Sequence, residues 1–101
     1  MKYSYIILHL AQEDYEESVL WYKQRSQQAS ENFIEAIENT LDLICNNPHR
    51  WRIGYKDFHE LGVKKFPHSI IYKIDRDNQQ VVVTAIYHGK RNPKKKYRKP
   101  R

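Results

Sequence analysis

The chain has 101 residues, of which 40% are hydrophobic and 30% charged, with a formal net charge of +6 and a pI near 9.5. This length and composition are typical of one globular domain with a modest core, and they exclude a disordered or fibrous chain. The single cysteine excludes an internal disulfide, and no apolar stretch is long enough for a membrane span or a signal peptide. We therefore expect one cytoplasmic domain over residues 1–101 that has no membrane partner.

The basic charge is concentrated at the end of the chain. Eight of the residues 90–101 are Lys or Arg, whereas residues 1–89 contain ten basic and twelve acidic residues. The basic tail therefore begins at about residue 90. Even without the tail, acidic residues dominate the first half and basic residues the second. Such a surplus favours an anionic partner, namely nucleic acid, anionic lipid or an acidic protein.

The first predicted elements are a strand and a helix. Residues 2–9 are rich in Tyr and Ile, as strands are. A helix is predicted over residues 11–25 because Tyr15, Val19 and Tyr22 recur with helical spacing. Four acidic residues lie in what would be its first turns, where the helix dipole favours anions.

A second helix follows after a short link. Ser26 or Ser30 is predicted to cap its start, and Asn46-Asn47-Pro48 to end it just after Ile44. Cys45 falls in its apolar pattern and is expected in the core. The predicted buried stripe consists of Phe33, Ile37, Leu41 and Ile44. Two helices joined this closely form an antiparallel hairpin.

The rest of the chain is predicted to form a loop and three strands. Residues 49–59 have the composition of a loop, and Asp77-Asn78 are expected to supply a hairpin turn. The predicted strands are 60–66, 68–75 and 80–88. The order β-α-α-β-β-β predicts an α+β fold in which an antiparallel sheet packs against the helical hairpin.

No familiar catalytic motif and no metal-ligand spacing occurs in the sequence, and we expect neither a metal nor a cofactor. In an antiparallel meander, the second and fourth strands end at the same edge of the sheet. That edge would bring Lys64 and Lys65 near His88, Arg91 and Tyr97. Basic groups with Tyr and His among them suit a phosphate backbone and a stacked base.

The same residues suit the cleavage of RNA by its own 2′-hydroxyl group. That reaction needs a proton acceptor, a cation for the charge that develops on phosphate, and a proton donor. Arg91 or Lys64 and Lys65 can stabilise charge, and Tyr97 or His88 can transfer protons. The remaining tail residues expected to bind RNA are Lys90, Lys94, Lys95, Lys96, Arg98 and Lys99. The alternative is a solvated basic end that binds anions loosely.

A longer stretch of sequence resembles a known family. Residues 63–93, VKKFPHSIIYKIDRDNQQVVVTAIYHGKRNP, resemble the pattern of the RelE/ParE superfamily of bacterial type II toxins, and NNPHRW is similar to that family's Asn-Pro loop. The resemblance implies a growth-inhibiting, plasmid-stabilising toxin. It also implies a cognate antitoxin and a toxin–antitoxin hetero-oligomer.

The resemblance leaves two targets open. RelE-like toxins cut mRNA on the ribosome without a metal, whereas ParE-like toxins poison DNA gyrase without enzymatic activity. Arg91 followed by Tyr97 is similar to the terminal pair of the ribonucleases, and Lys64 and Lys65 to their basic residues. Ser69 stands where those ribonucleases have a further arginine. The first hypothesis is a ribosome-dependent mRNA endoribonuclease; the alternatives are a gyrase poison and an anion-binding module.

Overall fold

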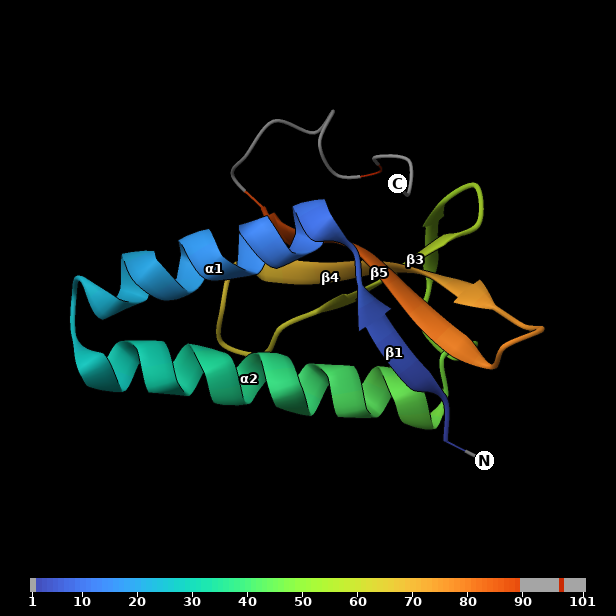
Figure 1. Cartoon of the computed structure of the whole chain (residues 1–101), viewed down its shortest axis with the longest axis horizontal. Coiled ribbons are helices and arrows are strands. Elements are labelled where there is room, and N and C mark those ends of the chain that lie inside the picture. Colours follow the sequence, from blue (N-terminus) through green and yellow to red (C-terminus); the bar gives the residue numbers. More distant parts are fainter. Residues whose placement is uncertain (1, 90–96, 98–101) are drawn as a thin grey trace.

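Two helices cover one face of a five-stranded sheet (Figure 1). The structure is a computed structural model, and it describes residues 2–89 and Tyr97. The elements are β1 (Ser4–Ile7), α1 (His9–Lys23), α2 (Gln27–Asn46), β2 (Ile53–Tyr55), β3 (Phe58–Gly62), β4 (His68–Asp75) and β5 (Gln80–His88). This order confirms the predicted α+β class. Within the described residues, no helix is long and apolar enough to cross a membrane.

The structure shows where the two helices begin, which can be compared with the predicted starts. Ser26 caps α2, because its hydroxyl accepts a hydrogen bond from the Ala29 backbone N–H at 2.9 Å. Helix α1 begins at His9, two residues earlier than predicted, so its first turn contains no acidic residue. Glu13 lies one turn further on and pairs with His9 at 3.2 Å. The four acidic residues predicted for the first turns of this helix therefore lie beyond its first turn, and the prediction was wrong for that turn.

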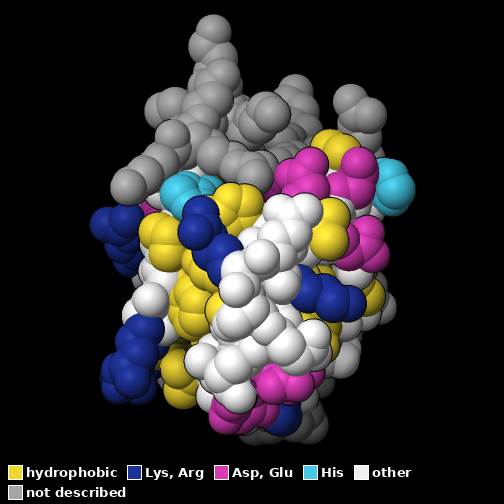
Figure 2. Space-filling view, turned by 90° about the vertical axis from the view of Figure 1, so that its left-hand side faces the viewer, with side chains coloured by type: hydrophobic (Ala, Val, Ile, Leu, Met, Phe, Trp, Pro, Cys, Tyr) yellow, Lys and Arg dark blue, Asp and Glu magenta, His cyan; other side chains and the backbone are white. Residues whose placement is uncertain are grey.

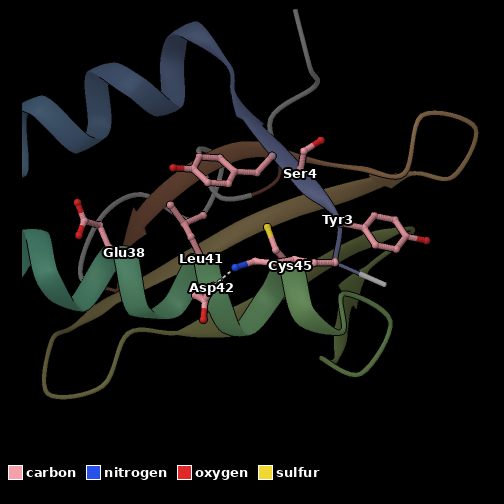
Figure 3. A pocket seen from close by; sticks show the side chains of 8 residues that line it. Tyr3, Ser4, Glu38, Leu41, Asp42 and Cys45 are labelled. Atoms are coloured by element: carbon pink, nitrogen blue, oxygen red, sulfur yellow. Dashed lines mark hydrogen bonds and ion pairs between the residues drawn. The ribbon is translucent and has the colours of Figure 1, made fainter.

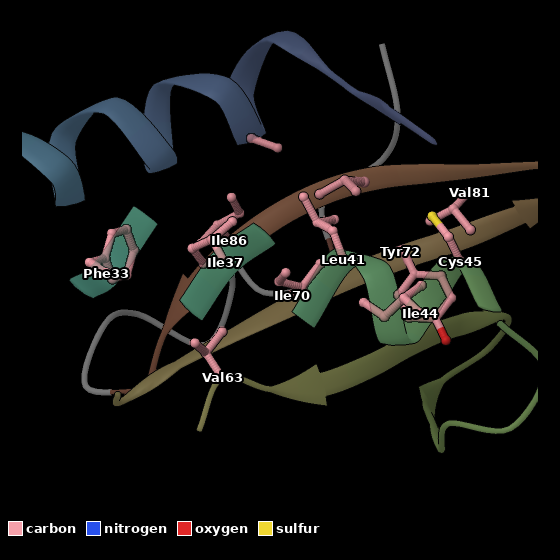
Figure 4. Packing of buried hydrophobic residues seen from close by; sticks show 12 residues of the cluster. Phe33, Ile37, Leu41, Ile44, Cys45, Val63, Ile70, Tyr72, Val81 and Ile86 are labelled. Carbon is pink, nitrogen blue, oxygen red and sulfur yellow. The ribbon is translucent and has the colours of Figure 1, made fainter. Parts of the chain in front are cut away.

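The core lies between the two helices and the sheet (Figure 4). All four residues of the predicted α2 stripe are buried, and they pack against Ile70, Tyr72, Val83 and other strand residues. Cys45 is only 2% exposed, as predicted. Burial raises the pKa of its thiol, which keeps it protonated and a poor nucleophile.

The strand order in the sheet is β1-β5-β4-β3-β2. Strands β3 to β5 form the predicted antiparallel meander, which β2 extends by one further strand, but β1 pairs parallel to β5, with Ile6 opposite Val82. The sheet is therefore mixed and not wholly antiparallel. The reason is that the helical hairpin separates β1 from the meander, so β1 joins the sheet at the free edge of the last strand.

The segment predicted as a loop contains further strand structure. Within residues 49–59 lie all of β2 and the start of β3, which pair antiparallel. Strand β2 is three exposed residues long, too short for an alternating apolar pattern. Strand β3 ends at Gly62, so Lys64 and Lys65 belong to the turn before β4 and not to a strand.

A buried hydrogen bond holds the segment after α2 against the sheet. The hydroxyl of Tyr72, a fully buried residue of β4, donates to the Pro48 carbonyl at 2.6 Å. Burial raises the pKa of this hydroxyl well above its ordinary value, so it remains a donor. We expect Tyr72→Phe to lower the free energy of unfolding by about 1–3 kcal/mol, because the buried carbonyl loses its partner. Urea denaturation measures this loss; Tyr5→Phe, at an exposed position, serves as the control and should change little.

Candidate functional site

The face of the sheet that points away from the helices carries a second hydrophobic cluster. Side chains alternate along a strand, so Ile70 and Tyr72 face the helices whereas Ile71 faces away. We call this second face the tyrosine face and define it by Phe58, Glu60, Ser69, Ile71, Ala85, Tyr87 and Tyr97.

A carboxylate, a phenol and a guanidinium meet on the tyrosine face. Glu60 is only 6% exposed, and its Oε1 accepts a hydrogen bond from the Tyr97 hydroxyl at 2.9 Å. The same oxygen lies 3.2 Å from a guanidinium nitrogen of Arg52, whose side chain is 73% exposed. Both partners favour the charged carboxylate and offset the cost of burying it. The cluster therefore combines a proton acceptor, a proton donor and a cation.

Aromatic packing fixes the ring of Tyr97 beside Glu60. The ring centroid lies 5.6 Å from that of Phe58 on β3 and 5.3 Å from that of Tyr55 on β2. The β2–β3 hairpin thus supplies both the carboxylate and the surface on which Tyr97 rests. Since β2 was expected to be part of a loop, this arrangement was not predicted from the sequence.

Gly54 makes room for the contact between Tyr97 and Glu60. A Cβ atom at this position would collide with both the Tyr97 hydroxyl and Oε1 of Glu60. The backbone of Gly54 is not in the left-handed region, so its glycine is required for space and not for conformation. Only a residue without a side chain allows the two oxygens to approach each other across β2.

His88 lies on the opposite side of the sheet from Tyr97. It pairs with His68 across β4 and β5, and the two ring centroids are 4.9 Å apart. His68 is buried with its Nε2 3.2 Å from the Ser18 hydroxyl of α1. The pair therefore belongs to the face that the helices cover.

Lys64 and Lys65 lie at the end of the sheet where β3 and β5 both finish. The register, with Gly62 opposite Ser69 and Ser69 opposite Tyr87, confirms that these strands end at the same edge. However, the two lysines line a groove of about 650 Å³ between their own turn and α2. Figure 2 views the molecule from the end where the helical hairpin turns and shows Lys and Arg side chains among hydrophobic ones.

Arg91 lies outside the described residues. The same holds for the tail residues predicted to bind RNA, namely Lys90, Lys94, Lys95, Lys96, Arg98 and Lys99. Of the predicted site residues, the structure thus describes Tyr97, His88, Lys64 and Lys65, and it places Tyr97 alone on the tyrosine face.

Another pocket, of about 440 Å³, lies between β1 and α2 (Figure 3). Lys2 and Asp42 form an ion pair there, and the hydrogen bond with Asp42 raises the pKa of Lys2. Cys45 also lines this pocket, but burial keeps its thiol protonated. Within residues 2–89 and Tyr97, no group of three His, Cys, Asp or Glu residues is placed to hold a metal ion. The cluster around Glu60 is therefore the stronger candidate.

Comparison with known families agrees with the fold. The model of a family described as ParE toxin of type II toxin-antitoxin system, parDE, matches residues 5–93, which is most of the chain. A search among proteins with curated descriptions found no match. The family match confirms the resemblance to the RelE/ParE superfamily, and the chain therefore belongs to the ParE toxin family of type II toxin–antitoxin systems.

Proposed function

We propose that this type II toxin is a metal-independent, ribosome-dependent endoribonuclease that cleaves mRNA at the tyrosine face. The observation that supports the proposal is the meeting of Glu60, Tyr97 and Arg52 within hydrogen-bonding distance. These three groups match the three requirements of cleavage by the 2′-hydroxyl: a base, an acid and a cation.

Each group has a defined role in the proposed reaction. Glu60 accepts the proton of the 2′-hydroxyl while that oxygen forms a bond to phosphorus. Arg52 stabilises the negative charge that develops on the phosphate oxygens. Tyr97 donates its proton to the departing 5′-oxygen as the P–O bond breaks. The products are a 2′,3′-cyclic phosphate and a 5′-hydroxyl end.

The hydrogen bond between Tyr97 and Glu60 also provides a route for resetting the site. After one cleavage the glutamate carries a proton and the tyrosine lacks one. The two oxygens are 2.9 Å apart, so the proton can return directly to Tyr97. Because Tyr97 covers the buried carboxylate in the free protein, the RNA must shift its ring to reach Glu60.

The other predicted site residues are proposed to hold RNA outside the reacting atoms. Arg91 and the basic tail would contact phosphates of the message or the ribosome, a sequence-independent interaction that weakens with salt. Lys64, Lys65 and His88 would contact the backbone near the edge where β3 and β5 end.

Membership of a toxin–antitoxin family implies an antitoxin partner. We propose that its binding segment is acidic and covers the basic second half of the chain, in a hetero-oligomer. Charge attraction would speed association, while buried apolar contacts would set the dissociation rate.

The test of the proposed function is a reconstituted translation reaction with purified ribosomes and a defined mRNA. We expect the wild-type toxin to produce cuts that primer extension maps to the ribosome-bound codon, and a cyclic phosphate at each upstream end. Cleavage should persist in excess EDTA once the ribosomes have been stabilised with polyamines. Intact mRNA together with trapped gyrase–DNA complexes in a parallel supercoiling reaction would reject the proposal.

The gyrase alternative has one observation in its favour. Ser69 lies on the tyrosine face, opposite Tyr87, at the position where the RelE ribonucleases have an additional arginine. A neutral residue there reduces the positive charge available to the phosphate. Under this alternative, the tyrosine face and the tail bind protein instead of RNA.

A further inference from the structure

We propose that Tyr55 and Lys56, at the tip of the β2–β3 hairpin, form a nucleotide-binding subsite. In this subsite the Tyr55 ring stacks on a nucleobase beside the scissile bond, and Lys56 contacts a neighbouring phosphate. The inference rests on the proposed function, since it names a part of the RNA that the same face would bind.

The exposure and position of Tyr55 support the subsite. Tyr55 is 49% exposed, although it is a large aromatic side chain at the end of a strand. Its ring lies 5.3 Å from that of Tyr97, which in turn donates a hydrogen bond to Glu60. A base stacked on Tyr55 would therefore lie next to the proposed reacting groups.

Lys56 adds a cation at the same place. Its ammonium lies 5.4 Å from the centroid of the Tyr55 ring, within the range of a cation–π contact. Its backbone has a φ of 49°, in the left-handed region where glycine is the favoured residue. A lysine in this strained position is unfavourable for folding, and such outliers cluster at functional sites.

The charges around the hairpin tip suit an anionic ligand. Asp57, the acidic neighbour of Lys56, is paired with Lys73 at 3.4 Å, and Glu60 is paired with Arg52. The side chains of Lys56 and Arg52 are both exposed. An exposed aromatic ring flanked by cations is the usual surface for single-stranded RNA, because every base can stack on the ring while the cations contact phosphates.

The test uses the full-length toxin and a fluorescein-labelled hexa-adenosine oligonucleotide with 2′-O-methyl groups, which lacks the attacking hydroxyl. We expect Tyr55→Ala to weaken binding roughly ten-fold, as for the loss of one stacked base, and Tyr55→Phe to retain it. Lys56→Gly should weaken binding and reduce the dependence of the affinity on salt, because one phosphate contact is lost. Glycine adopts the left-handed backbone of this turn without strain, so the hairpin itself should stay intact. Tyr5→Ala is the matched control, since Tyr5 is equally exposed on the distant strand β1.

Two further measurements separate this subsite from the proposed function. With an oligonucleotide made of abasic units, Tyr55→Ala and wild type should bind alike. Equal binding of Tyr55→Ala and wild type to hexa-adenosine would overturn the subsite, even if the toxin cleaves mRNA on ribosomes. Conversely, a Tyr55-dependent affinity in a toxin that leaves ribosomal mRNA intact would retain the nucleotide subsite and reject the ribonuclease.

Discussion

Glu60→Gln is expected to lower the single-turnover rate of ribosome-dependent mRNA cleavage by about 10²–10⁴-fold, the usual contribution of a general base. Glutamine has the shape of glutamate and can still accept the hydrogen bond from Tyr97 at 2.9 Å. It cannot take up the proton of the 2′-hydroxyl. Tyr97→Phe should also lower the rate, because the phenylalanine has no proton for the departing oxygen.

The comparison needs a control for the loss of a negative charge. Glu31→Gln removes a carboxylate from the exposed side of α2, and it should leave both the rate and the free energy of unfolding unchanged. A Glu60→Gln variant that cleaves as fast as wild type, under conditions where chemistry limits the rate, would show that Glu60 is not the base. Inhibition of bacterial growth after induction should rank the variants in the same order as their cleavage activity.

Periodicity identified the helices and the main strands because their buried faces repeat at regular intervals. The α2 stripe was found correctly since Phe33, Ile37, Leu41 and Ile44 all contact one core. The meander was found for a similar reason, as β4 and β5 are long and rich in β-branched residues. A helix or strand that buries one face along its whole length therefore has a regular apolar pattern, and this pattern can be found in the sequence.

Short or edge elements carry no such signal. Strand β2 has three exposed residues, and its pairing with β3 depends on contacts across the Lys56-Asp57 link. The parallel pairing of β1 with β5 is also invisible in the sequence, because about seventy residues separate the two strands. The formation of β2 and the pairing of β1 with β5 both depend on tertiary contacts between separate segments of the chain, and local composition does not reveal them.

The candidate site was only partly predictable for the same reason. Tyr97 was predicted as a site residue because it is an aromatic residue in a basic tail. Its partner Glu60 lay in a predicted strand and Arg52 in a predicted loop, so neither was predicted to belong to the site. The one signal in the sequence that could have indicated this site was Glu60, a charged residue at a strand position that faces away from the helices. His88 and Tyr97 follow the same strand closely in sequence, yet they lie on opposite faces of the sheet.

Gly54→Ala is expected to reduce cleavage by about 10²-fold, because the added methyl group would displace the Tyr97 hydroxyl from Glu60. A misplacement of about 1 Å costs roughly this factor in other active sites. Gly54 is exposed and its backbone suits alanine, which by itself would raise the free energy of unfolding by about 0.4–1 kcal/mol. The displaced hydroxyl leaves the buried Glu60 with one hydrogen bond fewer, at a cost of about 1–3 kcal/mol, so we expect a net loss of stability. Cleavage is therefore compared at a temperature at which both proteins remain folded, so that a slower reaction reports positioning and not unfolding.

Gly62→Ala is the matched control for this prediction. Gly62 also lies in the β2–β3 hairpin, but a Cβ atom there would have no heavy atom within 4 Å. This variant should therefore keep wild-type cleavage. In the Tyr97→Phe background, Gly54→Ala should cost less than it does in wild type, because the displaced hydroxyl is already gone. Equal losses in the two backgrounds, or equal effects of Gly54→Ala and Gly62→Ala, would mean that Gly54 does not act by positioning Tyr97.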